Sequence, residues 1–189
     1  MPLASRILGG GVEAVVGMRW MAWFIFGLVA LTLQVVVIPR LAPSGFRPDL
    51  ALLFVVTMTA YERGVTPLVV AWLMGMLVDQ HSLERLGLVA MSYLLVALGV
   101  AGLRRAFSLG GVVMLTGTTF LAAAATQLLW AIYRAWMYGA GGLGSAPSWK
   151  SILMSAGLTA ILALPVAGLL RWFGVREGRR LRVRSSRRS

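Results

Sequence analysis

Long apolar segments, in which polar and apolar residues do not alternate, dominate this chain. Hydrophobic residues make up 59% of its 189 residues and charged residues only 13%, and a single soluble core could not bury that much apolar surface. In lipid every backbone polar group must be paired within the protein, which leaves helices or a closed barrel, and barrel strands would alternate. The sequence therefore predicts an all-α fold, a polytopic membrane helix bundle.

Turn residues and charges divide the chain into three parts. We expect a short N-terminal segment (1–19), a transmembrane domain (20–173) and an Arg-rich tail (174–189). A glycine-rich loop, 139–148, should precede the last span. The predicted spans are residues 20–38, 49–61, 65–79, 86–103, 111–137 and 151–173.

The number of spans depends on the apolar stretch 50–78, which Glu62-Arg63-Gly64 and Pro67 interrupt. Two helices on either side of this turn would be about 18 and 22 Å long, shorter than the roughly 30 Å apolar layer. One continuous helix would give five spans and place Arg63 at mid-membrane, at a cost of about 2.5–3.5 kcal/mol. We prefer six transmembrane helices, with five as the alternative.

The net charge of +12 suggests nucleic acid at first sight, but eight of the 18 basic residues lie between Arg171 and Arg188. This clustering indicates a cytoplasmic anchor that attracts anionic lipid, and no nucleic-acid partner. A further docking role for an acidic cytoplasmic partner stays open. With six spans, both termini are expected in the cytoplasm. The anchor residues are Arg104, Arg105, Arg179, Arg180, Arg182 and Arg184.

Two acidic residues, Asp49 and Asp79, lie at the ends of predicted membrane helices. They could form an aspartyl dyad, as in an intramembrane peptidase. Alternatively Asp49 caps a helix and Asp79 pairs with Arg47 or Arg85, which we prefer because no second catalytic element accompanies them. The chain has no cysteine and one histidine, so we expect no thiolate or multi-His metal site, no cofactor and no enzyme activity.

Other polar and aromatic residues in the spans suggest packing roles. Gln34 and Gln127 are expected to hydrogen-bond across helices, each contributing about 0.6–2 kcal/mol. Aromatic residues at predicted span ends should lie at the membrane interface. These are Trp20, Trp23, Trp136, Tyr138, Trp149 and Trp172.

Three short motifs occur in order: Arg47-Pro48-Asp49-Leu50 at the start of a helix, with Pro48 suited to its first turn; Ala71 to Asp79, with Gly75 four residues before Asp79; and Leu86-Gly87. In this order and spacing the chain resembles the rod shape-determining MreD family over residues 47–105. It departs from the family at residues 80–85, where a small turn containing Gly or Pro is usual.

The resemblance implies a non-catalytic subunit of the elongation (Rod) complex in the bacterial cytoplasmic membrane, supporting lateral peptidoglycan synthesis and rod shape. It also implies binding to MreC and, directly or through MreC, to RodA and a class B penicillin-binding protein, with MreB filaments on the cytoplasmic side. The family is similar in fold to the substrate-binding subunits of energy-coupling-factor vitamin transporters. The alternative function is therefore a small-molecule transporter subunit with an external pocket near Asp49 and Asp79. The structural or partner-binding candidates are Pro48, Asp49, Gly75, Asp79, Leu86 and Gly87.

Overall fold

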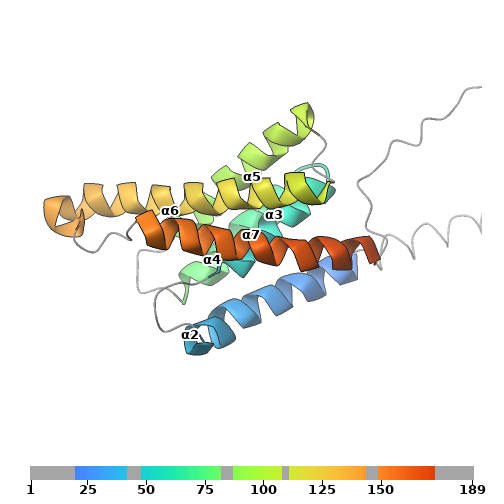
Figure 1. Cartoon of the computed structure of the whole chain (residues 1–189), viewed down its shortest axis with the longest axis horizontal. Helices are drawn as coiled ribbons and strands as arrows, with labels where there is room; N and C mark the ends of the chain where they lie inside the picture. The colour runs from blue at the N-terminus through green and yellow to red at the C-terminus, as the bar shows by residue number, and fades with distance from the viewer. Residues whose placement is uncertain (1–19, 42–47, 82–86, 108–110, 144–148, 173–189) are drawn as a thin grey trace, which may run out of the picture.

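The computed structural model describes residues 20–41, 48–81, 87–107, 111–143 and 149–172. Every regular element in these ranges is a helix, so the predicted all-α class is confirmed. The first helix covers Trp20–Arg40 and passes through a π-helical turn before its end. The labelled elements are η1 (Leu33–Val37), α2 (Ile38–Leu41), α3 (Leu50–Tyr61), α4 (Thr66–Asp79), α5 (Leu88–Ala106), α6 (Val112–Leu143) and α7 (Trp149–Trp172) (Figure 1).

Among the described residues, four helices are long and apolar enough to cross a membrane: the first helix, α5, α6 and α7. The stretch 50–78 forms two helices, because α3 ends at Tyr61 and α4 begins at Thr66. With 12 and 14 residues, these two helices measure about 18 and 21 Å. Gly64 makes the turn between them with φ +100°, a conformation that favours glycine. The number of membrane crossings stays a prediction.

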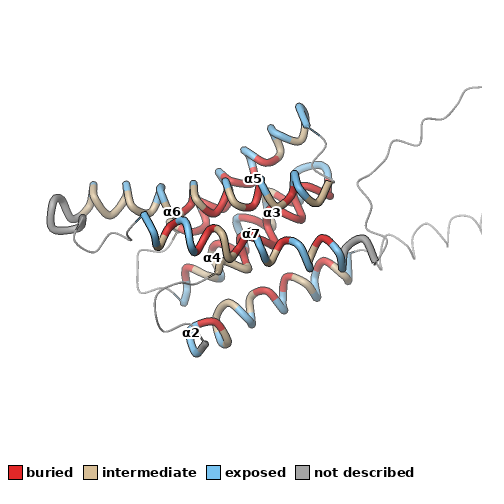
Figure 2. Tube along the Cα trace, viewed as in Figure 1, coloured by how far each residue is buried: buried red, intermediate tan, exposed pale blue. Residues whose placement is uncertain are grey.

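Helix α3 is the centre of the bundle. Every residue from Ala51 to Tyr61 is buried, as the tube in Figure 2 shows, and a helix that is apolar on all sides belongs in an interior. It packs against α4, α5, α6, α7 and η1, while α4 pairs most extensively with α5 and α6 with α7. The outer helices expose large apolar side chains, as expected for surfaces that face lipid.

The first helix contacts α3 through a narrow stripe. Trp23 and Ala30 on this stripe are buried, whereas most of their neighbours on the helix are exposed. Gly27 faces the Phe54 ring of α3, where an added Cβ would lie 3.1 Å from the ring. Trp23 also meets Phe54 edge to face, with ring centroids 6.1 Å apart. Of the four long apolar helices, the first is the least buried. In its 18-residue apolar segment 22% of the residues are buried, against 33–39% in the other three helices.

Two side chains from other helices bind the C-terminal end of α3. The Arg104 guanidinium of α5 donates to the Thr59 carbonyl oxygen at 2.9 Å and to the Glu62 carbonyl oxygen. Trp23 Nε1 of the first helix donates to Glu62 Oε1 at 2.9 Å. The last carbonyls of a helix have no partner within it, and a cation there also interacts favourably with the helix dipole. Arg104 therefore has a structural contact, whereas Arg105 is exposed.

Helix α6 is longer than predicted. A loop was expected from Gly139, but helix α6 continues to Leu143, and the rest of that stretch, 144–148, lies outside the described residues. Each residue added to an existing helix gains a hydrogen bond, so a helix can extend into a glycine-containing stretch despite its poor propensity. The predicted anchor residues Arg179, Arg180, Arg182 and Arg184 lie outside the described residues.

We expect Arg104→Ala to lower the free energy of unfolding by about 1.5–3 kcal/mol, because carbonyls at the end of α3 would lose a charged donor. Arg105→Ala removes the same charge one residue along and should change stability little. Thermal unfolding of both variants in the same detergent measures the difference. Equal unfolding temperatures would show that Arg104 contributes charge alone.

Candidate functional site

Asp79 joins α4 to α5. Its carboxylate is buried at the end of α4, and Oδ2 accepts hydrogen bonds from the Gly87 and Ala90 amides at 2.9 and 3.1 Å. Oδ1 accepts a third, from the Val89 amide at 3.1 Å. These are the amides of Gly87, the residue before α5, and of two residues in its first turn, which otherwise have no partner within the helix. Asp79 therefore acts as an N-terminal cap supplied by the preceding helix.

Gly75 allows the close packing on which this cap depends. A Cβ at residue 75 would lie 2.3 Å from Ala90 Cα, a distance that real Cβ atoms do not show. Gly87 precedes α5 with φ +99°, so a glycine is favoured there as well. Gly75, Asp79 and Gly87 thus form one helix junction: Gly75 brings the helices together, Asp79 caps α5, and Gly87 makes the turn into it.

Asp49 caps α3 in the usual way for an N-terminal cap. Its Oδ1 accepts from the Leu52 amide at 2.9 Å. The same oxygen accepts from the Tyr93 hydroxyl of α5 at 2.7 Å. Tyr93 is 1% exposed, so its hydroxyl needs a partner inside the bundle, and Asp49 provides it.

Two further helices meet at the same point. The Asp49 amide donates to Thr159 Oγ1 of α7 at 3.0 Å, and the Leu50 amide donates to Gln34 Oε1 at 2.8 Å. Gln34 lies in η1, where the Ile38 amide bonds to the Leu33 carbonyl five residues back. The expected inter-helix hydrogen bond of Gln34 is therefore present. Side chains of the first helix, α5 and α7 therefore all bind the start of α3, at Leu50 or at its cap residue Asp49.

The predicted site residues divide into those the structure places and those it does not describe. Pro48 precedes the cap residue, since α3 begins at Leu50; the expectation that it opens the first helical turn is wrong by two positions. Leu86 lies outside the described residues. So do Arg47 and Arg85, the expected partners of Asp79.

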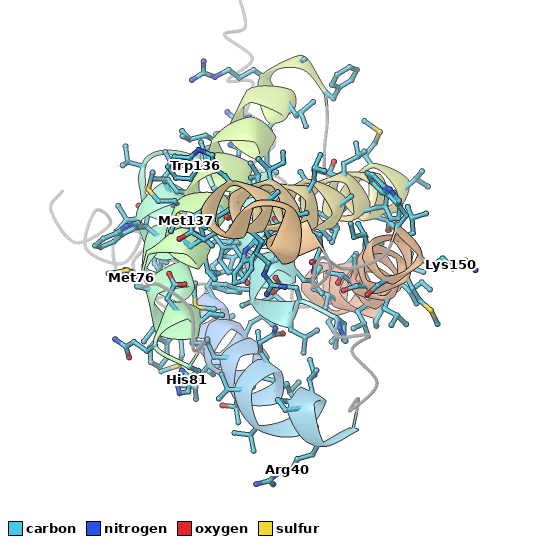
Figure 3. The ribbon with its side chains drawn as sticks, turned by 90° about the vertical axis from the view of Figure 1, so that its left-hand side faces the viewer. Arg40, Met76, His81, Trp136, Met137 and Lys150 are labelled. Atoms are coloured by element: carbon cyan, nitrogen blue, oxygen red, sulfur yellow. The ribbon has the colours of Figure 1, made fainter. Side chains whose placement is uncertain are left out.

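The two carboxylates lie at the same end of the bundle, where α3 begins and α4 ends. Figure 3 looks onto this end: Arg40, His81 and Lys150 lie at its rim with their side chains directed outward. Both aspartates instead accept hydrogen bonds from helix amides, and Asp49 accepts one from Tyr93 as well. This arrangement suits capping. The expectation of a non-enzyme without a cofactor stays a prediction.

Tyr93 and Thr159 were not identified from the sequence as partners of the motif residues. Each is a polar residue inside a long apolar segment, and this alone indicates from the sequence that its hydroxyl has a hydrogen-bond partner when it is buried. Which partner it finds depends on helix packing across 44 and 110 residues of chain. The structural contact of Arg104 was also missed, because a basic residue at a span end first indicates topology.

Asp79→Ala should lower the free energy of unfolding by about 3 kcal/mol, because three amides at the α4–α5 junction lose their acceptor. We expect Asp49→Ala to act similarly at α3, while Gln80→Ala, an exposed neighbour, should have little effect. The amount of assembled protein in membranes and its thermal unfolding in detergent measure this. Normal levels and stability with lost complex formation would show instead that the aspartates contact a partner.

Comparison with known proteins tests the resemblance over most of the chain. The family model for the rod shape-determining protein MreD matches residues 16–173. No curated protein and no solved structure matches, so the expected likeness in fold to vitamin-transporter subunits gains no support. The match extends well beyond residues 47–105, where the motifs lie, and includes all the helices. The chain is an integral protein of the inner membrane and belongs to the MreD family of rod shape-determining proteins.

Proposed function

We propose that this protein is a non-catalytic subunit of the elongation (Rod) complex, which binds MreC and supports lateral peptidoglycan synthesis and rod cell shape. The observation that carries the proposal is the family match over residues 16–173. Through MreC the subunit would reach RodA and a class B penicillin-binding protein, with MreB filaments on the cytoplasmic side. The Arg-rich tail would bind anionic lipid headgroups.

The hydrogen bonds of the motif residues support a structural role. Asp79 and Gly75 join α4 to α5, and Asp49 joins α3 to α5 through Tyr93. A bundle held in this way is a preorganised surface, which lowers the entropy that a binding partner must lose. The motifs would then act on partner binding indirectly, by keeping the outer helices in place.

For the orientation, we propose that the end of the bundle containing Arg104 faces the cytoplasm. The start of the first helix and the end of α7 lie at that end, as does the turn between α3 and α4 that contains Arg63 (Figure 1). Basic residues concentrate on the cytoplasmic side of membrane proteins. The aspartate-containing end would then face outward.

Reporter fusions after Arg63 and after Arg105 test this orientation. Both should report the cytoplasm if α3 and α4 form a hairpin that enters and leaves the membrane. A fusion after His81, which lies between α4 and α5, should report the outer side. An external signal at Arg63 or Arg105 would contradict the proposed orientation.

Co-purification tests partner binding. We expect a tagged chain, extracted from membranes in a mild detergent, to retain MreC through a stoichiometric contact between transmembrane helices. Arg105→Ala, which should leave the fold intact, serves as a control and should retain MreC to the same extent as the parent chain. Isolation of the well-folded chain without MreC, from membranes rich in MreC, would count against the proposal.

A further inference from the structure

Hydrogen bonds between helices fix how far each helix extends along the bundle. At the Arg104 end, where α3 ends, Trp23 and Arg104 both bind Glu62. At the aspartate end, where α3 begins, the Asp49 amide binds Thr159 of α7. Residues joined in this way lie at the same height along the bundle axis, so the lengths of the outer helices can be compared from these two ends.

Helix α7 is long enough for the whole apolar layer. From Thr159 it continues for 13 residues to Trp172, about 20 Å toward the Arg104 end, which is close to the length of α3. In the other direction it continues for ten residues to Trp149, about 15 Å past the height of Asp49. Helix α6, which packs on α7, extends further still on this side (Figure 1).

Helices α4 and α5 are shorter and meet at a common height. Asp79, the last residue of α4, binds the start of α5, and Tyr93 in the second turn of α5 binds Asp49, so this height is close to that of the start of α3. Measured from here, α4 is about 21 Å long, and α5 reaches Arg104 after about 24 Å. Both helices are therefore about 6–9 Å shorter than an apolar layer of roughly 30 Å.

We call the outward faces of α4 and α5 the short side. Helix α4 packs mainly on α5 and α3, which leaves the rest of its surface on the outside of the bundle. Exposed polar residues mark the two ends of this surface: Arg63 before α4, and Gln80 and His81 after it. Between these ends the large exposed side chains are apolar. They are Val65, Val69, Trp72, Leu73 and Leu77 at α4 and Met91, Leu95, Leu98 and Leu103 on α5.

A flat bilayer cannot match the short side. With Arg63 at one boundary of an apolar layer of roughly 30 Å, Gln80 and His81 would lie about 6–9 Å inside the other boundary. Polar side chains in contact with lipid are costly, and moving the chain the other way would bury Arg63 and Arg105 instead. A bilayer accommodates a short hydrophobic surface by thinning locally, at a modest cost per ångström of mismatch.

We propose that the short side thins the bilayer beside it, so that lipid headgroups at the aspartate end lie about 6–9 Å closer to the bilayer centre there than beside α7. The partner of this surface is lipid, and lipids with short acyl chains would fit it best. The inference goes beyond the proposed function and does not depend on it, because it follows from the helix lengths and from the polar residues that bound the short side.

Spin labels at two matched positions test this difference in depth. The chain has no native cysteine, so single-cysteine variants need no background substitutions. Leu77→Cys on α4 and Ile161→Cys on α7 are at exposed positions, 42% and 61%, and each lies two residues from Asp79 or Thr159, which mark similar heights. In a flat bilayer both labels would lie near the centre, about 17 Å from the Arg104 end of their helices.

The labelled full chain is reconstituted alone in dioleoylphosphatidylcholine vesicles, so that no other protein covers the short side. We expect the label on residue 77 to collide with a water-soluble nickel chelate about threefold more often than the label on residue 161, because headgroups lie close to it. A label at Leu98→Cys of α5, far from both ends of that helix, should be as inaccessible as the label on residue 161 and controls for insertion. Equal accessibility of residues 77 and 161 would overturn the proposal.

Arginine substitutions at the same two positions provide an independent test in cell membranes. Leu77→Arg should assemble in the same amount as the parent chain, because its guanidinium reaches the headgroups of a thinned layer. Ile161→Arg places the same charge near the bilayer centre and should lower the amount of assembled protein about tenfold. Equal losses for the two variants would show that residue 77 lies as deep as residue 161, and the proposal would fail. Neither test involves a partner protein, so either result leaves the co-purification test of the proposed function unaffected.

Discussion

The rest of the structure depends on the backbone groups at the two ends of α3, which the helix itself cannot pair. A helix of about 18 Å is too short to reach water on both sides of an apolar layer of roughly 30 Å, so its end groups need partners from the protein. Asp49 and Gln34 bind amides at its start, and Arg104 binds carbonyls at its end. Because the first helix supplies Gln34 and α5 supplies Arg104, the contacts that pair the end groups of α3 also hold its neighbours around it.

The junction between α4 and α5 follows the same principle on a smaller scale. A carboxylate at the end of α4 interacts unfavourably with the dipole of its own helix. It interacts favourably with the start of α5, where it accepts hydrogen bonds from backbone amides. Asp79 can reach these amides only if the backbones of α4 and α5 lie close together, and Gly75 permits that close packing. A motif of one glycine and one aspartate therefore specifies how two helices meet. The motif residues therefore lie in the interior, whereas the outer surfaces are apolar helix faces.

The outer helices differ in length. Helix α6 has 32 residues and measures about 48 Å, whereas α5 and α7 have 19 and 24 residues and measure about 29 and 36 Å. All three expose large apolar side chains, as expected for surfaces that face lipid. Membrane helices associate through close packing rather than through hydrophobic burial, so the shape of these faces matters more than their apolar area.

Apolar composition and the absence of alternation determined by themselves that the chain is a helical membrane protein, because lipid allows few other structures. The turn at Glu62-Arg63-Gly64 determined that residues 50–78 form two helices, since charge, glycine and a following proline all interrupt an apolar helix. Only the tertiary structure decided the hydrogen-bond partners of Asp49 and Asp79, the contacts of Arg104 and the length of α6. Tyr93 and Thr159 approach Asp49 through packing between helices far apart in the chain, and no local pattern of residues encodes such a distance.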